Sequence, residues 1–124
     1  MRLALPLFAA ALFVPVVAGA LQASPPQSGE ALFRQRCSMC HTVKPGAPAG
    51  MGPNLATVAG RKSASTDFSY TPAMKKAGLT WDRRHLNALL TAPAKTVPGS
   101  TMVVSVPNPQ ERAAIVDYLF KLKS

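Results

Sequence analysis

The sequence has 124 residues, which suits a single domain, and its 14 lysines and arginines outnumber five acidic residues to give a formal charge of +9. A positive charge of this size favours acidic protein faces or anionic membrane surfaces as partners. The basic residues form no concentrated run, and this argues against binding to nucleic acid.

Residues 1–20 have the pattern of a secretory signal peptide, with a basic start, an apolar stretch and the small residues Ala18-Gly19-Ala20. We therefore expect an exported, periplasmic protein. An uncleaved N-terminal membrane anchor is the alternative, because the apolar stretch carries no charge and approaches spanning length. Residues 21–27 are predicted to be a flexible leader, and residues 28–124 are predicted to form one domain.

A first helix is predicted after the leader. Ser28 is a suitable N-cap, and Glu30 lies in the first turn, where a negative charge suits the helix dipole. Leu32 and Phe33 give this helix an apolar face. The helix is expected to run up to the cysteine pair that follows it.

The motif Cys37-Ser38-Met39-Cys40-His41 contains both cysteines of the chain and one of its two histidines. The spacing C-x-x-C-H is the signature of c-type haem attachment. In that arrangement Cys37 and Cys40 each bond the porphyrin, and His41 can reach the iron as its proximal ligand. A buried haem would also add apolar bulk to a small domain and stabilise its folded state.

Three alternatives account for the cysteines without haem. A thioredoxin-like dithiol belongs in a βαβ context, and the sequence has no such pattern. A zinc site would need Cys37, Cys40, His41 and His85 together, and the adjacent Cys40 and His41 make poor tetrahedral geometry. A simple disulfide would leave His41 without a role.

Loops and short helices are predicted for the middle of the chain. Residues 42–60 are rich in glycine and proline and are expected to form a long loop around the haem edge. A helical turn is expected after Thr71-Pro72 and should stop at Gly78. Thr80 is the predicted N-cap of a longer helix, which has leucines on its buried face and ends before Pro93.

The last helix is the clearest element. Residues 94–107 are predicted to be irregular, and Asn108, Pro109 and Glu111 then have the spacing of an N-cap, a first helical residue and a capping box. Apolar residues recur at helical spacing after them. Because no strand or repeat is convincing, the predicted fold class is all-α.

A methionine is the expected ligand on the second face of the iron. Met51, Met74 and Met102 all follow the attachment motif. Met102 is favoured because it comes after Pro98 in an irregular segment, and a loop can cover the open haem face where a helix would not. A thioether ligand raises the reduction potential and suits electron transfer. His85, the other histidine, is predicted to be a surface residue.

Several motifs, taken in order, resemble the class I cytochrome c family, in the branch that includes the mitochondrial carrier and its bacterial relatives. These motifs are Gly29 with Phe33, C-S-M-C-H, Gly52-Pro53-Asn54-Leu55, Gly60-Arg61-Lys62, Phe68-Ser69-Tyr70-Thr71 and Pro98-Gly99-Ser100-Thr101-Met102. The resemblance implies a small all-α fold. Its N- and C-terminal helices would cross at Gly29, near Tyr118, and its long loops would wrap one covalent haem c with its iron.

The resemblance also implies roles for individual residues. Met102 would be the sixth iron ligand, and the Pro53 carbonyl would accept a hydrogen bond from His41 and so orient the ring. The other residues implied in the haem pocket are Arg61, Tyr70 and Trp81, which would hold a propionate, and Ser100.

The predicted function is one-electron transport by an exported monohaem c-type cytochrome that is not an enzyme. Its expected partners are redox proteins such as respiratory complexes, oxidases or periplasmic dehydrogenases, with peripheral contact to a membrane. The candidate docking charges are Arg36, Lys44, Lys75, Lys76 and Lys95. The alternative function is a peroxidase-like or ligand-sensing haem protein in which Met102 is displaceable.

Overall fold

Five helices follow one another in the computed structural model, which describes residues 12, 14–16 and 18–122. Their bounds are α1 Gly29–Arg36, α2 Pro72–Lys76, α3 Arg83–Thr91, α4 Pro93–Thr96 and α5 Pro109–Lys121. The described residues contain no strand, and one isolated β-bridge joins Lys62 to Thr80. The all-α prediction is therefore confirmed.

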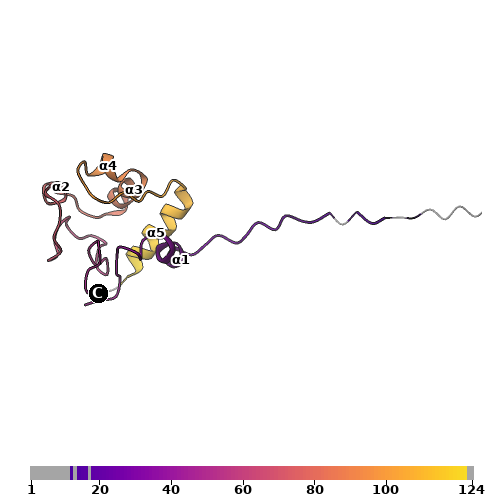
Figure 1. Ribbon diagram of the computed structural model, residues 1–124, viewed down its shortest axis with the longest axis horizontal. Coiled ribbons are helices and arrows are strands. Elements are labelled where there is room, and N and C mark those ends of the chain that lie inside the picture. The colour runs from indigo at the N-terminus through magenta and orange to yellow at the C-terminus, as the bar shows by residue number, and fades with distance from the viewer. Residues whose placement is uncertain (1–11, 13, 17, 123–124) are drawn as a thin grey trace, which may run out of the picture.

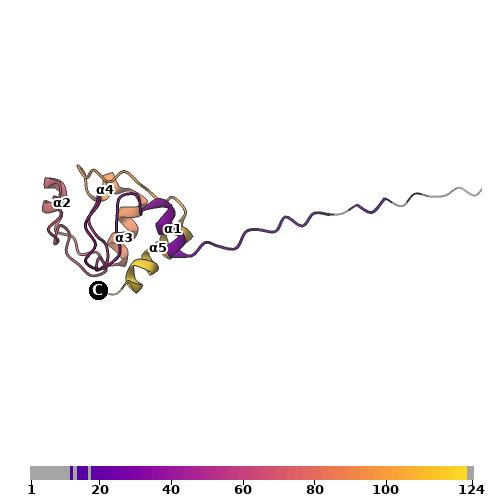
Figure 2. The ribbon, with the colours of Figure 1, turned by 60° about the horizontal axis from the view of Figure 1, so that its bottom comes forward.

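The chain before α1 runs away from the helices without regular secondary structure (Figures 1 and 2). Most of the predicted signal segment, namely residues 1–11, 13 and 17, lies outside the described residues, as do residues 123–124 of the predicted domain. Within the described part of the chain, no helix combines the length and the apolar character needed to cross a membrane.

Helices α1 and α5, far apart in the sequence, cross in close contact (Figures 1 and 2). At the crossing, a Cβ on Gly29 would overlap the backbone oxygen of Ala114 and lie 2.8 Å from Cβ of Tyr118. Farther along, the rings of Phe33 and Tyr118 have centroids 5.5 Å apart. The predicted crossing of the terminal helices is thus confirmed, and the missing side chain of Gly29 permits it.

The helix caps confirm part of the sequence prediction. The Ser28 side chain accepts a hydrogen bond from the backbone N–H of Ala31, and Asn108 accepts from those of Gln110 and Glu111. The predicted capping box is wrong in its second half. The carboxylate of Glu111 pairs with Arg36 at 2.7 Å, so this residue joins α5 to α1 instead of turning back to Asn108.

Two predictions about residues 80–107 are corrected. Asp82 rather than Thr80 caps α3, and its side chain accepts a hydrogen bond from the backbone N–H of His85. Thr80 is instead held in the β-bridge with Lys62. The segment predicted to be irregular begins with the short helix α4, which starts at Pro93 because proline suits the first helical position.

The hydrophobic core lies among α1, α3 and α5. Its largest fully buried side chains are Phe33, Leu32, Ile115, Val97 and Val106. Two of these come from the loops on either side of Met102, so the core extends beneath the segment expected to carry an iron ligand. The same packed cluster includes Trp81 and the leucines of α3.

Candidate functional site

A cavity of about 330 Å³ adjoins the core and is lined mainly by apolar side chains from α1, α2, α3, α5 and the loops between them. Eight of the nine residues predicted for the site line this cavity, namely Cys37, His41, Pro53, Arg61, Tyr70, Trp81, Ser100 and Met102. The ninth, Cys40, is partly buried and is not among the lining residues. Side chains separated by more than 60 positions in the sequence thus meet in one apolar space.

The attachment motif forms a tight turn at the end of α1. The backbone N–H of Cys37 donates to the Phe33 oxygen at 2.8 Å, and those of Cys40 and His41 donate to the Cys37 oxygen at 3.1 and 3.0 Å. This turn brings Cys37 and His41 to the same cavity. The two cysteines are not joined in a disulfide. Burial raises the pKa of the Cys37 thiol, against the opposing effect of the Arg36 charge.

The His41 ring is fixed from two sides. Its Nδ1 lies 2.8 Å from the carbonyl oxygen of Pro53, the contact that the family resemblance implies. A Cβ on Gly52 would overlap Cε1 of the ring and lie 2.7 Å from Nδ1, so the backbone packs directly against the imidazole. Burial lowers the pKa of His41, although the bond to Pro53 opposes this, and the neutral imidazole is the form that binds a metal.

Asn54 forms three hydrogen bonds within the long loop that follows His41. Its Nδ2 donates to the backbone oxygens of Lys44 and Ala47 at 2.8 and 2.9 Å, and its Oδ1 accepts from the N–H of Ala56 at 2.7 Å. These three bonds tie both arms of the loop together one residue after Pro53. Asn54 belongs to the motif Gly52-Pro53-Asn54-Leu55, but the sequence alone gives no sign of this role.

Arg61 lines the cavity, and one of its three side-chain nitrogens, Nε, has no hydrogen-bond partner among the described residues. Its two terminal nitrogens donate to the Thr57 hydroxyl at 3.3 Å and to the Asn54 carbonyl at 3.2 Å. Its Nε is buried and has no partner among the described residues. A buried donor without a partner is costly, so a carboxylate bound here would satisfy it.

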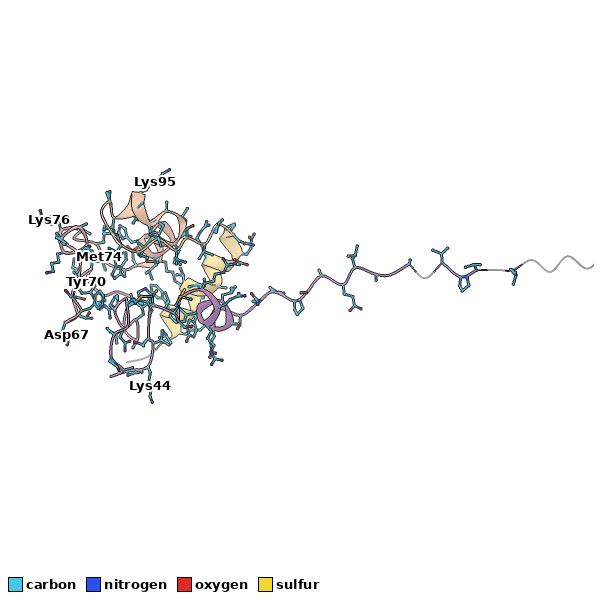
Figure 3. The ribbon with its side chains drawn as sticks, in the orientation of Figure 1. Lys44, Asp67, Tyr70, Met74, Lys76 and Lys95 are labelled. Atoms are coloured by element: carbon cyan, nitrogen blue, oxygen red, sulfur yellow. The ribbon has the colours of Figure 1, made fainter. Side chains whose placement is uncertain are left out.

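The other predicted pocket residues differ in their present contacts. The Tyr70 hydroxyl lies 2.6 Å from the hydroxyl of Thr66, and Tyr70 lies on the same side of the molecule as Met74 (Figure 3). Trp81 is buried, and its backbone exchanges hydrogen bonds with Gly60 and Arg61. Arg61 and Tyr70 thus add polar groups to a cavity that is mainly apolar.

Three methionines line the cavity, and they differ in accessibility. Met51 is 72% exposed, whereas Met74 and Met102 are half-buried and pack against the core. The backbone N–H of Met102 donates to the Ser100 hydroxyl at 3.2 Å, which holds the loop at this point. His85 lies on α3 beside Asp82 and does not line the cavity.

The chemistry of this site fits a haem. The cavity is mainly apolar, as a porphyrin requires, and it offers a thiol, an oriented imidazole, a thioether and an unpartnered arginine nitrogen for a propionate. Among the described residues, no group of three or more His, Cys, Asp or Glu side chains is arranged to hold a metal ion directly.

Comparison with known proteins adds independent information. A family model described as Cytochrome c matches residues 26–123. Cytochrome c2 of Rhodomicrobium vannielii is 44% identical over 104 residues, which cover 82% of this chain and 82% of that protein. Cytochrome c of Theileria annulata is 39% identical over 100 residues, with coverages of 80% and 87%. Cytochrome c2 of Rhodoblastus acidophilus is 40% identical over 104 residues, with coverages of 82% and 96%. The chain therefore belongs to the cytochrome c family of monohaem electron carriers, and its cofactor is one covalently bound haem c with its iron.

Proposed function

We propose that the protein is an exported one-electron carrier in which His41 and Met102 are the axial ligands of the haem iron, and Cys37 and Cys40 attach the porphyrin. The observation that carries this proposal is that His41 and Met102 line a single cavity, with the His41 ring oriented by Pro53. With both axial positions filled, the site favours electron transfer over chemistry on a small molecule.

The chain's residues have separate tasks in this proposal. Pro53 and Gly52 hold the imidazole in one orientation, which keeps its second nitrogen free for the iron. Arg61 receives a propionate at its unpartnered Nε, with Tyr70 and Trp81 beside it. The apolar lining excludes water, and the bound haem supplies the one-electron chemistry.

The charge distribution supports docking to acidic redox proteins, such as respiratory complexes, oxidases or periplasmic dehydrogenases. Among the described residues, Glu30, Glu111 and Asp117 form ion pairs with arginines, and no lysine takes part in an ion pair. Exposed lysines are therefore free to meet a partner; Figure 3 labels three of them, Lys44, Lys76 and Lys95, around the side that carries Tyr70 and Met74. Export to the periplasm rests on the signal-like pattern of residues 1–20.

A redox titration tests the function. The purified protein should take up one electron per chain reversibly, and its colour should remain with the polypeptide on acid-acetone extraction. It should bind cyanide slowly and turn over hydrogen peroxide no faster than free haem does. Rapid peroxide turnover would favour the peroxidase-like alternative, and colour lost on extraction would exclude covalent attachment.

Salt should slow the reaction with an acidic redox partner. The rate constant is expected to fall by about tenfold as ionic strength rises from a few millimolar to ~0.15 M, where the Debye length is about 8 Å. Stopped-flow reduction by an acidic partner measures this. An uncharged small-molecule reductant is the control and should show little dependence on salt. A flat response with the acidic partner would contradict electrostatic docking.

Substitution of Gly52 by alanine should disturb the proximal ligand. The new Cβ would overlap the His41 ring, so the ring must move away from Pro53, at an expected cost of about 1–3 kcal/mol. The ferric absorption spectrum of the holoprotein should change as well. Gly46→Ala is the control in the same loop, because Gly46 has a φ of +75° but open space around it. That variant should lose stability from backbone strain while keeping the wild-type spectrum.

A further inference from the structure

The three residues that follow Met102 are not held by hydrogen bonds, and the chain is first anchored at Val106. Val103 is 86% exposed, and residues 103–105 form no hydrogen bond with any described residue. Val106 is fully buried, and its backbone N–H donates to the Leu90 oxygen in α3 at 2.7 Å. The first fixed point after Met102 is therefore Val106.

Arg112 holds this fixed point through two hydrogen bonds and is itself joined to α3 by a third. Its Nη1 donates to the carbonyl oxygens of Val106 and Pro107 at 2.9 and 2.8 Å. Its Nε donates to Oδ1 of Asn87 at 3.0 Å. Because Asn87 is in α3 and Arg112 is in α5, one guanidinium joins both helices to the segment that leads back to Met102. Among the described residues, no other side chain forms a hydrogen bond with residues 103–107.

The opposite side of the loop is held independently. Met102 donates its N–H to the Ser100 hydroxyl, and Ser100 donates its own N–H to the Val97 oxygen at 3.0 Å. Only four peptide steps separate Met102 from Val106, and each spans at most about 3.6 Å. The position of Val106 therefore limits how far Met102 can withdraw from the cavity.

We propose that Arg112 is a positioning residue for Met102. Arg112 fixes the far end of residues 97–106, here called the ligand loop, and so resists displacement of the Met102 thioether from the iron. This inference rests on the proposed ligation by Met102. Loss of Arg112 would leave the buried Val106 carbonyl without its donor, and Val106 would then be held only by its N–H bond to Leu90 and by its buried side chain. Arg112 would thus determine how strongly the sixth position is closed.

Competition by imidazole tests the proposal. Ferric holoprotein is titrated with imidazole while the weak absorption of the methionine–iron bond is followed. In Arg112→Ala, half-displacement is expected at about a tenfold lower imidazole concentration, which corresponds to about 1.4 kcal/mol. Asn87→Ala removes the acceptor of Nε but keeps both carbonyl bonds, so it should shift in the same direction by less.

Arg83→Ala is the matched control. Arg83 also joins α3 to α5, through an ion pair with Asp117 and a guanidinium 4.4 Å from the centre of the Phe120 ring, but it does not contact the ligand loop. This variant should lose stability and keep the wild-type imidazole affinity. An equal shift in Arg83→Ala and Arg112→Ala would show that helix packing alone is responsible and would overturn the proposal.

The remaining outcomes are also decisive. An unchanged imidazole affinity in Arg112→Ala would overturn the role of Arg112, even if the methionine–iron absorption is present in wild type and lost in Met102→Ala. If Arg112→Ala does not fold, a shift in Asn87→Ala supports the proposal and its absence overturns it. If the absorption persists in Met102→Ala, the ligand assignment itself is wrong, and the role of Arg112 falls with it.

Discussion

Replacement of Gly29 by alanine is expected to destabilise the protein by about 3 kcal/mol or more, at the upper end of what overpacking costs. In an exposed helix the same change would be stabilising by about 1 kcal/mol, because alanine has the better helix propensity. At this position the new methyl group overlaps the Ala114 backbone oxygen, and no side-chain rotation can relieve that contact. Either α1 or α5 must move, which opens the packing of Phe33 on Tyr118.

Denaturant unfolding of the holoprotein, followed by far-ultraviolet circular dichroism, measures this loss. Gly60→Ala is the matched control, because Gly60 has a φ of +77° and nothing within 4 Å of an added Cβ. Its expected cost is about 1–2 kcal/mol, from left-handed backbone strain alone. A smaller loss for Gly29→Ala than for Gly60→Ala would contradict the close crossing of α1 and α5.

Local signals predict the N-terminal ends of α1 and α5. Ser28 and Asn108 cap their helices through side-chain bonds to N–H groups two or three residues away, so the sequence contains all the necessary information. The attachment turn is equally local, because its hydrogen bonds join Phe33 to Cys37 and Cys37 to Cys40 and His41. These features were therefore accessible before the fold was known.

Features that depend on tertiary contacts were missed or wrong. Thr80 and Asp82 are both acceptable N-caps, and the choice is made by the β-bridge that holds Thr80 against Lys62. Glu111 has capping-box spacing, but Arg36 lies within reach only after α1 and α5 have crossed. The sequence contains these residues but does not show which of two competing contacts is formed.

In the candidate site, too, local features can be predicted from the sequence and contacts between distant residues cannot. The attachment motif is contiguous, whereas the contact between His41 and Pro53 spans 12 positions and was expected only from a family resemblance. The hydrogen bonds that Asn54 forms within its loop, and those that Arg112 forms with Val106 and Pro107, have no recognisable sequence pattern. Each depends on backbone carbonyls, which every residue has, so residue identity gives no sign of the acceptor.

Replacement of Met102 by alanine is expected to open the sixth position of the haem iron. The weak absorption of the methionine–ferric iron bond should disappear, and the reduction potential should fall by on the order of 0.1 V or more, within the about 0.8 V that axial ligands span. Visible spectroscopy and a spectroelectrochemical titration measure the two changes. Because Met102 comes from a loop that packs on the core at Val97 and Val106, the fold should survive.

Met51 and Met74 supply the controls, since both line the same cavity. Met51→Leu and Met74→Leu keep similar volume and should keep the absorption. If the methionine–iron absorption persists in Met102→Ala, the thioether of Met51 or Met74 binds the iron instead. The Met102→Ala variant also distinguishes the electron carrier from the peroxidase-like alternative. If Met102 closes the sixth position in the wild type, the variant should bind cyanide rapidly and turn over peroxide, and the wild type should do neither. A wild-type protein already fast in both reactions would instead fit a displaceable ligand and a role in small-molecule chemistry.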